Sequence, residues 1–254
     1  MAIKLPLTVG LASLAISGLL VSAESEAAPK IDKGEIYFEL NHTDGDLGIH
    51  GRVGADPWKR MLVFNHRRQL LLDLTPGWVL AWEGMSEISF ESAEPNFDYL
   101  PPAEFFGRYP EGNYSLVGFS IHGQRMNFSV PVSHLLPAPA VSFVTGEPSA
   151  EDCDGALPEF ADDDVVIHWE EVTHSHPTIG RINEPTEIES YEVVIEVEDA
   201  DWKPSVLLPP DATEFEVPEE LLELADDGQV KYEIIARGEN KNQTAIESCF
   251  LVDL

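Results

Sequence analysis

The residues best suited to bind a ligand lie in one short turn in the first half of the chain. Asn41, Thr43, Asp44 and Asp46 place four oxygen-bearing side chains within six residues. Calcium prefers several oxygen ligands from a short loop, so Asn41, Asp44 and Asp46 form a candidate calcium site. The next seven residues contain no carboxylate, and the bidentate ligand of a calcium-binding hand is therefore missing. We prefer a polar hairpin turn without a cofactor, with Ca²⁺ as the alternative.

The sequence contains no set of residues that combines a nucleophile with a base. Gly118-Phe119-Ser120-Ile121-His122 is similar to a nucleophile elbow, but His122 stands where the second glycine is required. His174 and His176 lack an identifiable third metal ligand. We therefore assign no catalytic residue.

A hydrolase acting on carbohydrate or peptide is the alternative. It would need paired carboxylates in a cleft, with Trp58, Trp78 and Trp82 as a platform for sugar rings. Tryptophans of an all-β domain are more often part of the core, which is where we expect these three.

The chain has two cysteines, Cys153 and Cys249. Neither has a neighbouring His, Lys or Arg that would lower its pKa, so a catalytic thiol is not indicated. If the protein is exported, a single disulfide between them is the simple expectation.

The first residues are typical of a secretory signal peptide. Lys4 precedes an uncharged run from Leu5 to Val21, and Val21-Ser22-Ala23 forms a small-residue cleavage site. We predict that residues 1–23 are removed and that the protein is periplasmic or extracellular, with no membrane span after cleavage. A second possible cut follows Ala27. An uncleaved anchor is the alternative, because the run approaches the shortest length that crosses a bilayer.

Negative charge is concentrated in the second half of the chain. Residues 1–143 contain 10 Lys and Arg against 16 Asp and Glu, a net charge of −6, whereas residues 144–254 contain 5 against 30, a net charge of −25. Such a surface repels phosphate backbones and anionic lipids, because both kinds of binding need clustered Lys and Arg, and nucleic acid is excluded as a partner. The remaining partners are a protein or a component of the cell envelope.

Alternating apolar and polar residues predict an all-β fold. Ile36, Phe38 and Leu40 alternate before Asp44-Gly45, which indicates a hairpin. Six further runs, including Trp78 to Trp82, are expected to be strands, and Pro101 to Tyr109 is the only predicted helix. We expect two β-sandwich-like domains in tandem, at residues 31–136 and 137–254.

The second of these domains resembles a fibronectin type III domain, a seven-stranded Greek-key sandwich. The resemblance rests on Val165-Val166-Ile167-His168-Trp169 as strand B, Tyr191 to Glu196 as strand C, Thr213 to Pro218 as strand E, Tyr232 to Ala236 as strand F and Gln243 to Val252 as strand G. It covers about 110 residues, and no such resemblance is found for the first half. The arrangement of signal peptide, β domain and acidic type III-like domain also resembles that of secreted bacterial proteins, and this resemblance implies location and architecture but no reaction.

These observations favour a non-catalytic, exported binding or structural module. The hydrolase is the first alternative. A Ca²⁺-dependent adhesin that uses the Asp44 turn is the second.

Overall fold

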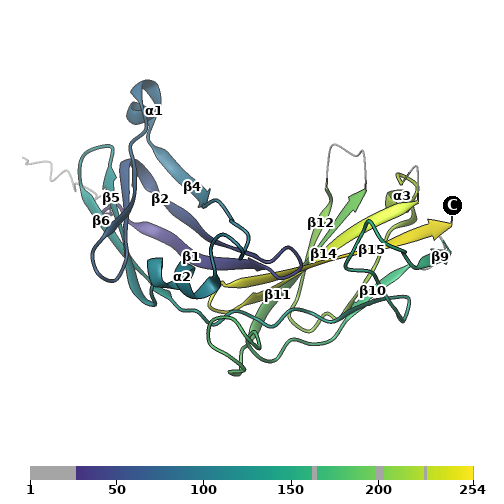
Figure 1. Ribbon diagram of the computed structural model, residues 1–254. Coiled ribbons are helices and arrows are strands. Elements are labelled where there is room, and N and C mark those ends of the chain that lie inside the picture. Colours follow the sequence, from purple (N-terminus) through teal and green to yellow (C-terminus); the bar gives the residue numbers. More distant parts are fainter. Residues whose placement is uncertain (1–26, 162–164, 198–202, 226–227, 254) are drawn as a thin grey trace, which may run out of the picture.

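The computed structural model describes residues 27–161, 165–197, 203–225 and 228–253. It shows two lobes side by side (Figure 1). We call residues 27–136 the first lobe and residues 137–253 the second lobe. Buried apolar residues form one core cluster within residues 31–136 and another within residues 140–252.

The first lobe is a strongly curved antiparallel sheet with two short helices. Its elements are β1 (Ile31–Asn41), β2 (Asp46–Phe64), β3 (Leu70–Leu74), α1 (Trp78–Glu83), β4 (Met85–Glu91), α2 (Pro102–Arg108), β5 (Gly112–Ser120) and β6 (Arg125–Val132). The long strand β2 organises this lobe, because its first half pairs with β1 and β4 while its second half pairs with β3 and β5. The register shifts beside Trp58, which is fully buried where the two halves meet.

The predicted hairpin between β1 and β2 is confirmed. Asn41 pairs with Asp46, and Gly45 has a positive φ of 68° that few other residues adopt readily. The predicted helix at Pro101 to Tyr109 is also present as α2, which starts at a proline and buries Phe105 and Phe106 against the sheet.

The strand predicted at Trp78 to Trp82 is wrong, because this segment forms the helix α1. Five consecutive apolar residues carry no alternation that would place one face on a core. Gly77 and Gly84 flank the helix, and Gly84 adopts a φ of 81°. Within the described ranges, no helix is both long and apolar enough to cross a bilayer.

The second lobe is a β-sandwich. Its elements are β7 (Ser142–Val144), β8 (Glu147–Pro148), β9 (Glu159–Ala161), β10 (Val166–Trp169), β11 (Ile188–Val197), β12 (Ser205–Leu208), β13 (Glu214–Glu216), α3 (Glu219–Leu222), β14 (Gln229–Gly238) and β15 (Gln243–Asp253). One sheet has the order β12-β11-β14-β15, and the facing sheet has the order β13-β10-β7-β8.

Alternate residues of β10, β11 and β14 form the inner faces of these sheets. Ile167 and Trp169 of β10 are buried opposite Tyr191 and Val193 of β11 and the corresponding residues of β14. The helix α3 was not predicted. It starts after Pro218 and buries only Leu222.

The predicted disulfide joins Cys153 to Cys249, with 5.5 Å between the Cα atoms. Cys249 is buried in β15, whereas Cys153 lies in the acidic segment before β9. The bond closes a loop over a sequence separation of 96 residues, so it fixes this charged segment to the last strand of the sandwich.

The two lobes share one continuous sheet. The end of β1 pairs in parallel with the start of β15, with Glu39 opposite Gln243 and Asn41 opposite Ala245. This pairing, which we call the seam, joins the sheet of the first lobe to the β12-β11-β14-β15 sheet of the second lobe, and the result is one sheet of 11 strands. It lies at the centre of the molecule (Figure 1).

Asn242 closes the seam with a fully used side-chain amide. Its Oδ1 accepts a hydrogen bond from the backbone N–H of Phe38 at 2.9 Å. Its Nδ2 donates to the carbonyl oxygens of Ser133 and Leu135 at 2.8 and 2.9 Å. The side chain is 2% exposed, so these bonds replace water that the site excludes.

Replacing Asn242 by alanine is expected to lower the free energy of unfolding by about 2–4 kcal/mol, because the buried N–H of Phe38 and the partly buried carbonyl of Ser133 lose their partner. Asn240→Ala is the matched control. Asn240 bonds the same carbonyl of Leu135 but is only partly buried, so its loss is expected to be about 1 kcal/mol. Urea unfolding followed by circular dichroism measures both. Equal effects would contradict a special role for Asn242.

Candidate binding surfaces

The Asp44 turn lies against the second lobe. The backbone N–H of His42 donates to the carbonyl of Ala245 at 2.9 Å, and the N–H of Glu247 donates to Thr43 Oγ1 at 2.9 Å. Asn41 Nδ2 donates to Asp44 Oδ2 at 3.1 Å, while Asn41 Oδ1 accepts from the N–H of Asp44. Both ends of the Asn41 amide are thus used within the turn, and Thr43 bonds to β15.

Carboxylates crowd around Asp46 without forming a metal-binding group. Burial raises the pKa of Asp46 to about 6, with further contributions from the nearby charges of Glu94, Asp44 and Glu247. In the part of the chain that the structure describes, no three His, Cys, Asp or Glu side chains are arranged to hold a metal ion. Asn41, Asp44 and Asp46 share the turn, but the contacts present bond the turn internally and to β15.

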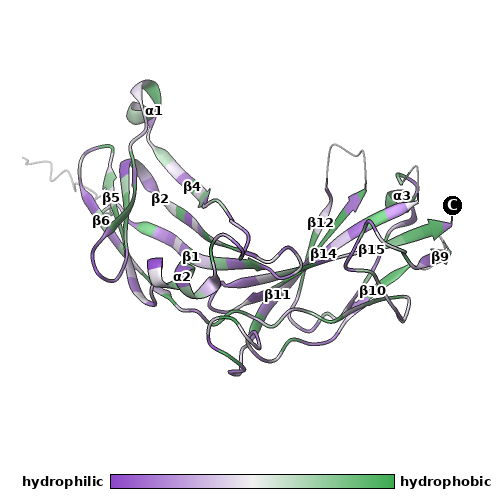
Figure 2. Cartoon of the chain, in the orientation of Figure 1, coloured by the Kyte–Doolittle hydropathy of each residue, from purple (hydrophilic) through white to green (hydrophobic). Residues whose placement is uncertain are grey.

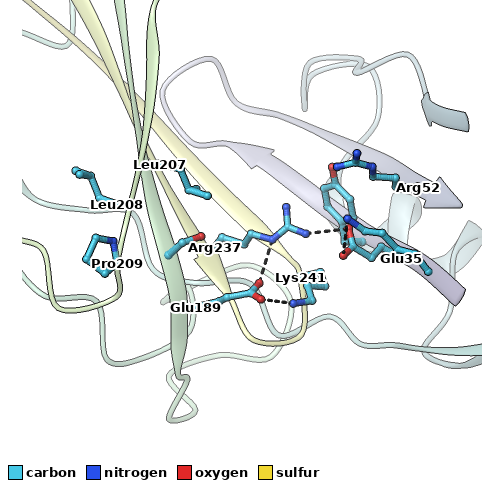
Figure 3. Close-up of a pocket in the computed structure, with 11 residues that line it drawn as sticks. Glu35, Arg52, Glu189, Leu207, Leu208, Pro209, Arg237 and Lys241 are labelled. Atoms are coloured by element: carbon cyan, nitrogen blue, oxygen red, sulfur yellow. Dashed lines mark hydrogen bonds and ion pairs between the residues drawn. The ribbon is translucent and has the colours of Figure 1, made fainter. Parts of the chain in front are cut away.

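A groove of about 500 Å³ lies beside the seam, between β1 and β2 on one side and β11, β12 and β14 on the other (Figure 3). Arg237 lies at its centre. The guanidinium donates to Glu35 of the first lobe at 3.1 Å and to Glu189 of the second lobe at 3.3 Å, and it lies 5.1 Å from the centre of the Tyr37 ring. Lys241 also pairs with Glu189.

The charges of this groove largely neutralise one another. Four cations line it, Lys33, Arg52, Arg237 and Lys241, and each is paired with a carboxylate. One of these pairs, Arg237 with Glu35, joins the two lobes. A second ion pair between the lobes joins Arg181 to Glu111 through two hydrogen bonds of 2.8 and 3.0 Å.

The two neighbouring histidines of the second lobe, His174 and His176, make different contacts, and His174 Nδ1 lies 2.9 Å from Thr173 Oγ1. His176 is buried at the junction, with its Nε2 atom 3.2 Å from His42 Nδ1. Burial, together with the charge of His42, lowers the pKa of His176 to about 4. This imidazole is therefore neutral at physiological pH.

Among the described residues, α1 carries the largest group of neighbouring large apolar side chains that are exposed. It projects from the top of the first lobe, away from the seam (Figure 1), and Figure 2 shows hydrophobic green on it. Trp78 and Trp82 are 81% and 76% exposed, and Val79 and Leu80 are 47% and 45% exposed. No residue of the helix is buried. We call Trp78, Val79, Leu80 and Trp82 the α1 knob.

The end of α1 at Gly84, which we call the root of the knob, packs closely against the sheet. A methyl group on Gly84 would lie 2.7 Å from Ile121 Cγ2 and 2.9 Å from Pro57 Cβ, so only glycine fits where the chain returns to β4. Trp78 has a φ of 41°, a strained conformation for a bulky residue. Such strain is concentrated at functional sites.

The expectation that Trp58, Trp78 and Trp82 all belong to the core is therefore only partly correct. Trp58 is fully buried, whereas the other two are exposed. The three cannot act together as a sugar platform. The sequence did contain a signal for the exposed pair: an apolar run between glycines that follows neither the helical nor the strand period.

Comparisons with known proteins give weak similarity throughout. No family model matches the chain, and no curated protein matches it. A tetra-tandem repeat from the extending region of a large adhesion protein is 12% identical, with a TM-score of 0.30. It aligns with 87% of this chain, which spans only 50% of that structure.

Two chicken structures built from fibronectin type III domains match similarly. The FN1–FN3 domains of CNTN1 are 8% identical with a TM-score of 0.34, covering 89% of this chain and 69% of that one. A two-domain segment of tenascin is 10% identical with a TM-score of 0.29, covering 89% and 99%.

The type III-like character of the second lobe follows from its own strand order. The strands that the sequence assigns to B and E, β10 and β13, are neighbours in one sheet, with β7 in the place of strand A. The strands assigned to C, F and G, which are β11, β14 and β15, follow one another in the other sheet. This is the division of a fibronectin type III sandwich, and the resemblance is confirmed.

Replacing Asp46 by asparagine is expected to stabilise the protein at neutral pH. The folded state raises the pKa of this acid from 3.8 to about 6, so folding favours the protonated form. The ionised carboxylate destabilises the fold fully above pH 6, and the effect disappears as the pH falls through 3.8. Because Asp46 is partly exposed, we expect a gain of about 1–2 kcal/mol at pH 7.5.

Urea unfolding at pH 7.5 and pH 4 measures this effect. The gain should shrink at pH 4. The exposed Asp98→Asn variant removes the same charge elsewhere and is expected to change little. An equal gain in both variants would mean that only the net charge matters.

Proposed function

We propose that the protein is an exported, non-catalytic binding module that contacts a component of the cell envelope through the α1 knob. The observation that carries this proposal is the exposure of two tryptophans on a projecting helix with a fixed root. Exposed apolar patches of this kind mark interaction sites, since a soluble protein gains no stability from them.

The second lobe acts as a rigid, acidic spacer in this proposal. Its sandwich continues the sheet of the first lobe, so the knob has a set direction relative to the second lobe. Its net charge of −25 over residues 144–254 discourages contact with anionic surfaces and favours solubility. The proposed contact uses no metal and no cofactor.

Export rests on the signal peptide, which lies outside the described residues, and on the disulfide, which is typical of oxidising compartments. We place the protein in the periplasm or outside the cell. Mass spectrometry of protein recovered from the exported fraction of its host is expected to show a chain that starts at Glu24, or at Ala28 if the second site is used. A chain that retains residues 1–23 in the membrane fraction would instead show an uncleaved anchor.

Removing both knob tryptophans, with Trp78→Ser and Trp82→Ser, is expected to reduce binding of the purified protein to envelope fragments of its host by about tenfold or more. The reason is that aromatic anchors dominate the energy of most contacts. Sedimentation of the fragments with labelled protein measures the bound fraction. The fold should persist, because neither side chain is buried.

Tyr99→Ser is the matched control. Tyr99 is 87% exposed and lies in the loop before α2, beyond the other end of β4 from the knob. Its loss is expected to leave binding unchanged. Adding EDTA should also have no effect, and a loss of binding in EDTA would favour the Ca²⁺-dependent adhesin instead. Equal binding by the wild type and the double variant would contradict the proposal.

A further inference from the structure

We infer that the target of the α1 knob is a lipid bilayer, into whose headgroup region the helix inserts. This inference rests on the proposed function and names the partner class. Three observations favour a bilayer over a protein: the shape of the knob, its composition and the charges around its root.

The knob is convex and small. Its helix has six residues and is about 9 Å long, comparable to the depth of about 5–10 Å that interfacial helices reach in a bilayer. A specific protein interface of standard size needs about 20–30 residues from each partner. The sheet beside the knob offers no comparable apolar extension, since Lys59, His122 and Arg125 are exposed there.

The composition of the knob suits the boundary between lipid tails and headgroups. Trp78 and Trp82 are four residues apart, so they lie on the same side of the helix. Tryptophan is enriched at this boundary because its ring is apolar and its N–H is polar. Val79 and Leu80 add aliphatic surface that can enter the outer part of the tail region.

The cations of the chain are distributed to match an anionic membrane surface at this end. Every Lys and Arg of the second lobe forms an ion pair: Arg181, Lys203, Lys231, Arg237 and Lys241. Within the described residues, five cations form no ion pair, and all of them belong to the first lobe: Lys30, Lys59, Arg67, Arg68 and Arg125.

Three of these unpaired cations lie on the segments that hold the root of the knob. Lys59 Nζ donates to the carbonyl of Ile121 at 3.2 Å, and Ile121 is the residue that Gly84 approaches. Arg125 follows in the same β5–β6 hairpin, and Lys30 pairs through its backbone with Asp56, next to Pro57. Two carboxylates on the same segments, Glu83 of α1 and Asp56, form no ion pair within the described structure and offset two of these three cations, which leaves a small positive excess at this end. Anionic headgroups would therefore repel the acidic second lobe far more than this end, which orients the knob toward the membrane.

Vesicle flotation tests this inference with the purified protein lacking residues 1–23, so that an anchor cannot contribute. We expect binding to phosphatidylcholine vesicles, and stronger binding when about one lipid in four is phosphatidylglycerol. Trp78→Ser with Trp82→Ser should reduce binding to both by about tenfold or more, because interfacial binding scales with the apolar area buried. Tyr99→Ser should bind like the wild type.

Two further readouts separate insertion from simple attraction. Tryptophan emission of the wild type should shift to shorter wavelength with vesicles, and this shift should be absent in the double variant. Lys59→Gln with Arg125→Gln should reduce the preference for phosphatidylglycerol while leaving binding to phosphatidylcholine intact. Binding that depends on the cations but not on the tryptophans would overturn insertion.

The outcomes distinguish this inference from the proposed function. If the wild type does not bind vesicles but still needs Trp78 and Trp82 to bind envelope fragments, the target is a protein or polysaccharide, and only the lipid inference fails. If the tryptophans matter in neither experiment, both proposals fail.

Discussion

The parallel pairing of β1 with β15 is the constraint on which the rest of the structure depends. Two cores of ordinary size could move independently if only a linker joined them. Here the first strand of one lobe is the sheet neighbour of the last strand of the other. Asn242, the residue before β15, forms hydrogen bonds with β1 and with residues 133–135. Separating the lobes would therefore expose buried N–H and C=O groups.

Charge strengthens this junction in a protein that otherwise repels itself. Residues 144–254 contain only five cations, and two of them, Arg181 and Arg237, bond carboxylates of the first lobe. Exposed ion pairs contribute little, but Arg237 is partly buried and also lies over the Tyr37 ring. The attraction is therefore concentrated where the lobes meet, while the like charges face solvent elsewhere.

Local sequence patterns predicted the parts of the fold that depend on neighbouring residues. Alternation in Tyr191 to Val197 reports burial on one face of a strand, and Asp44-Gly45 supplies the positive φ of a hairpin. The seam could not be predicted in this way. Asn242 and Phe38 are 204 residues apart, and Asn-Gln-Thr has the composition of a polar turn. The candidate calcium residues do share one turn, but the sequence could not show that the turn packs against β15.

The α1 segment shows why exposure is harder to predict than burial. An apolar run is normally explained by a core, and the irregular period of this run shows only that it matches neither the buried face of a helix nor that of a strand. In the sequence, β3 precedes this run and β4 follows it, and both strands pair with β2. No position in the sheet beside β2 is therefore left for the residues between them.

A free helix of six residues is not stable in water, and the conformation of the knob must therefore come from its attachments. Gly84 lies directly against Pro57, which precedes the buried Trp58 in β2, and against Ile121, which follows Ser120, the residue of β5 that pairs with Trp58. The strain at Trp78 and the exposure of four apolar side chains both oppose folding. The packed sheet of the first lobe holds this unfavourable feature in place, which is the arrangement expected when binding rather than stability requires it.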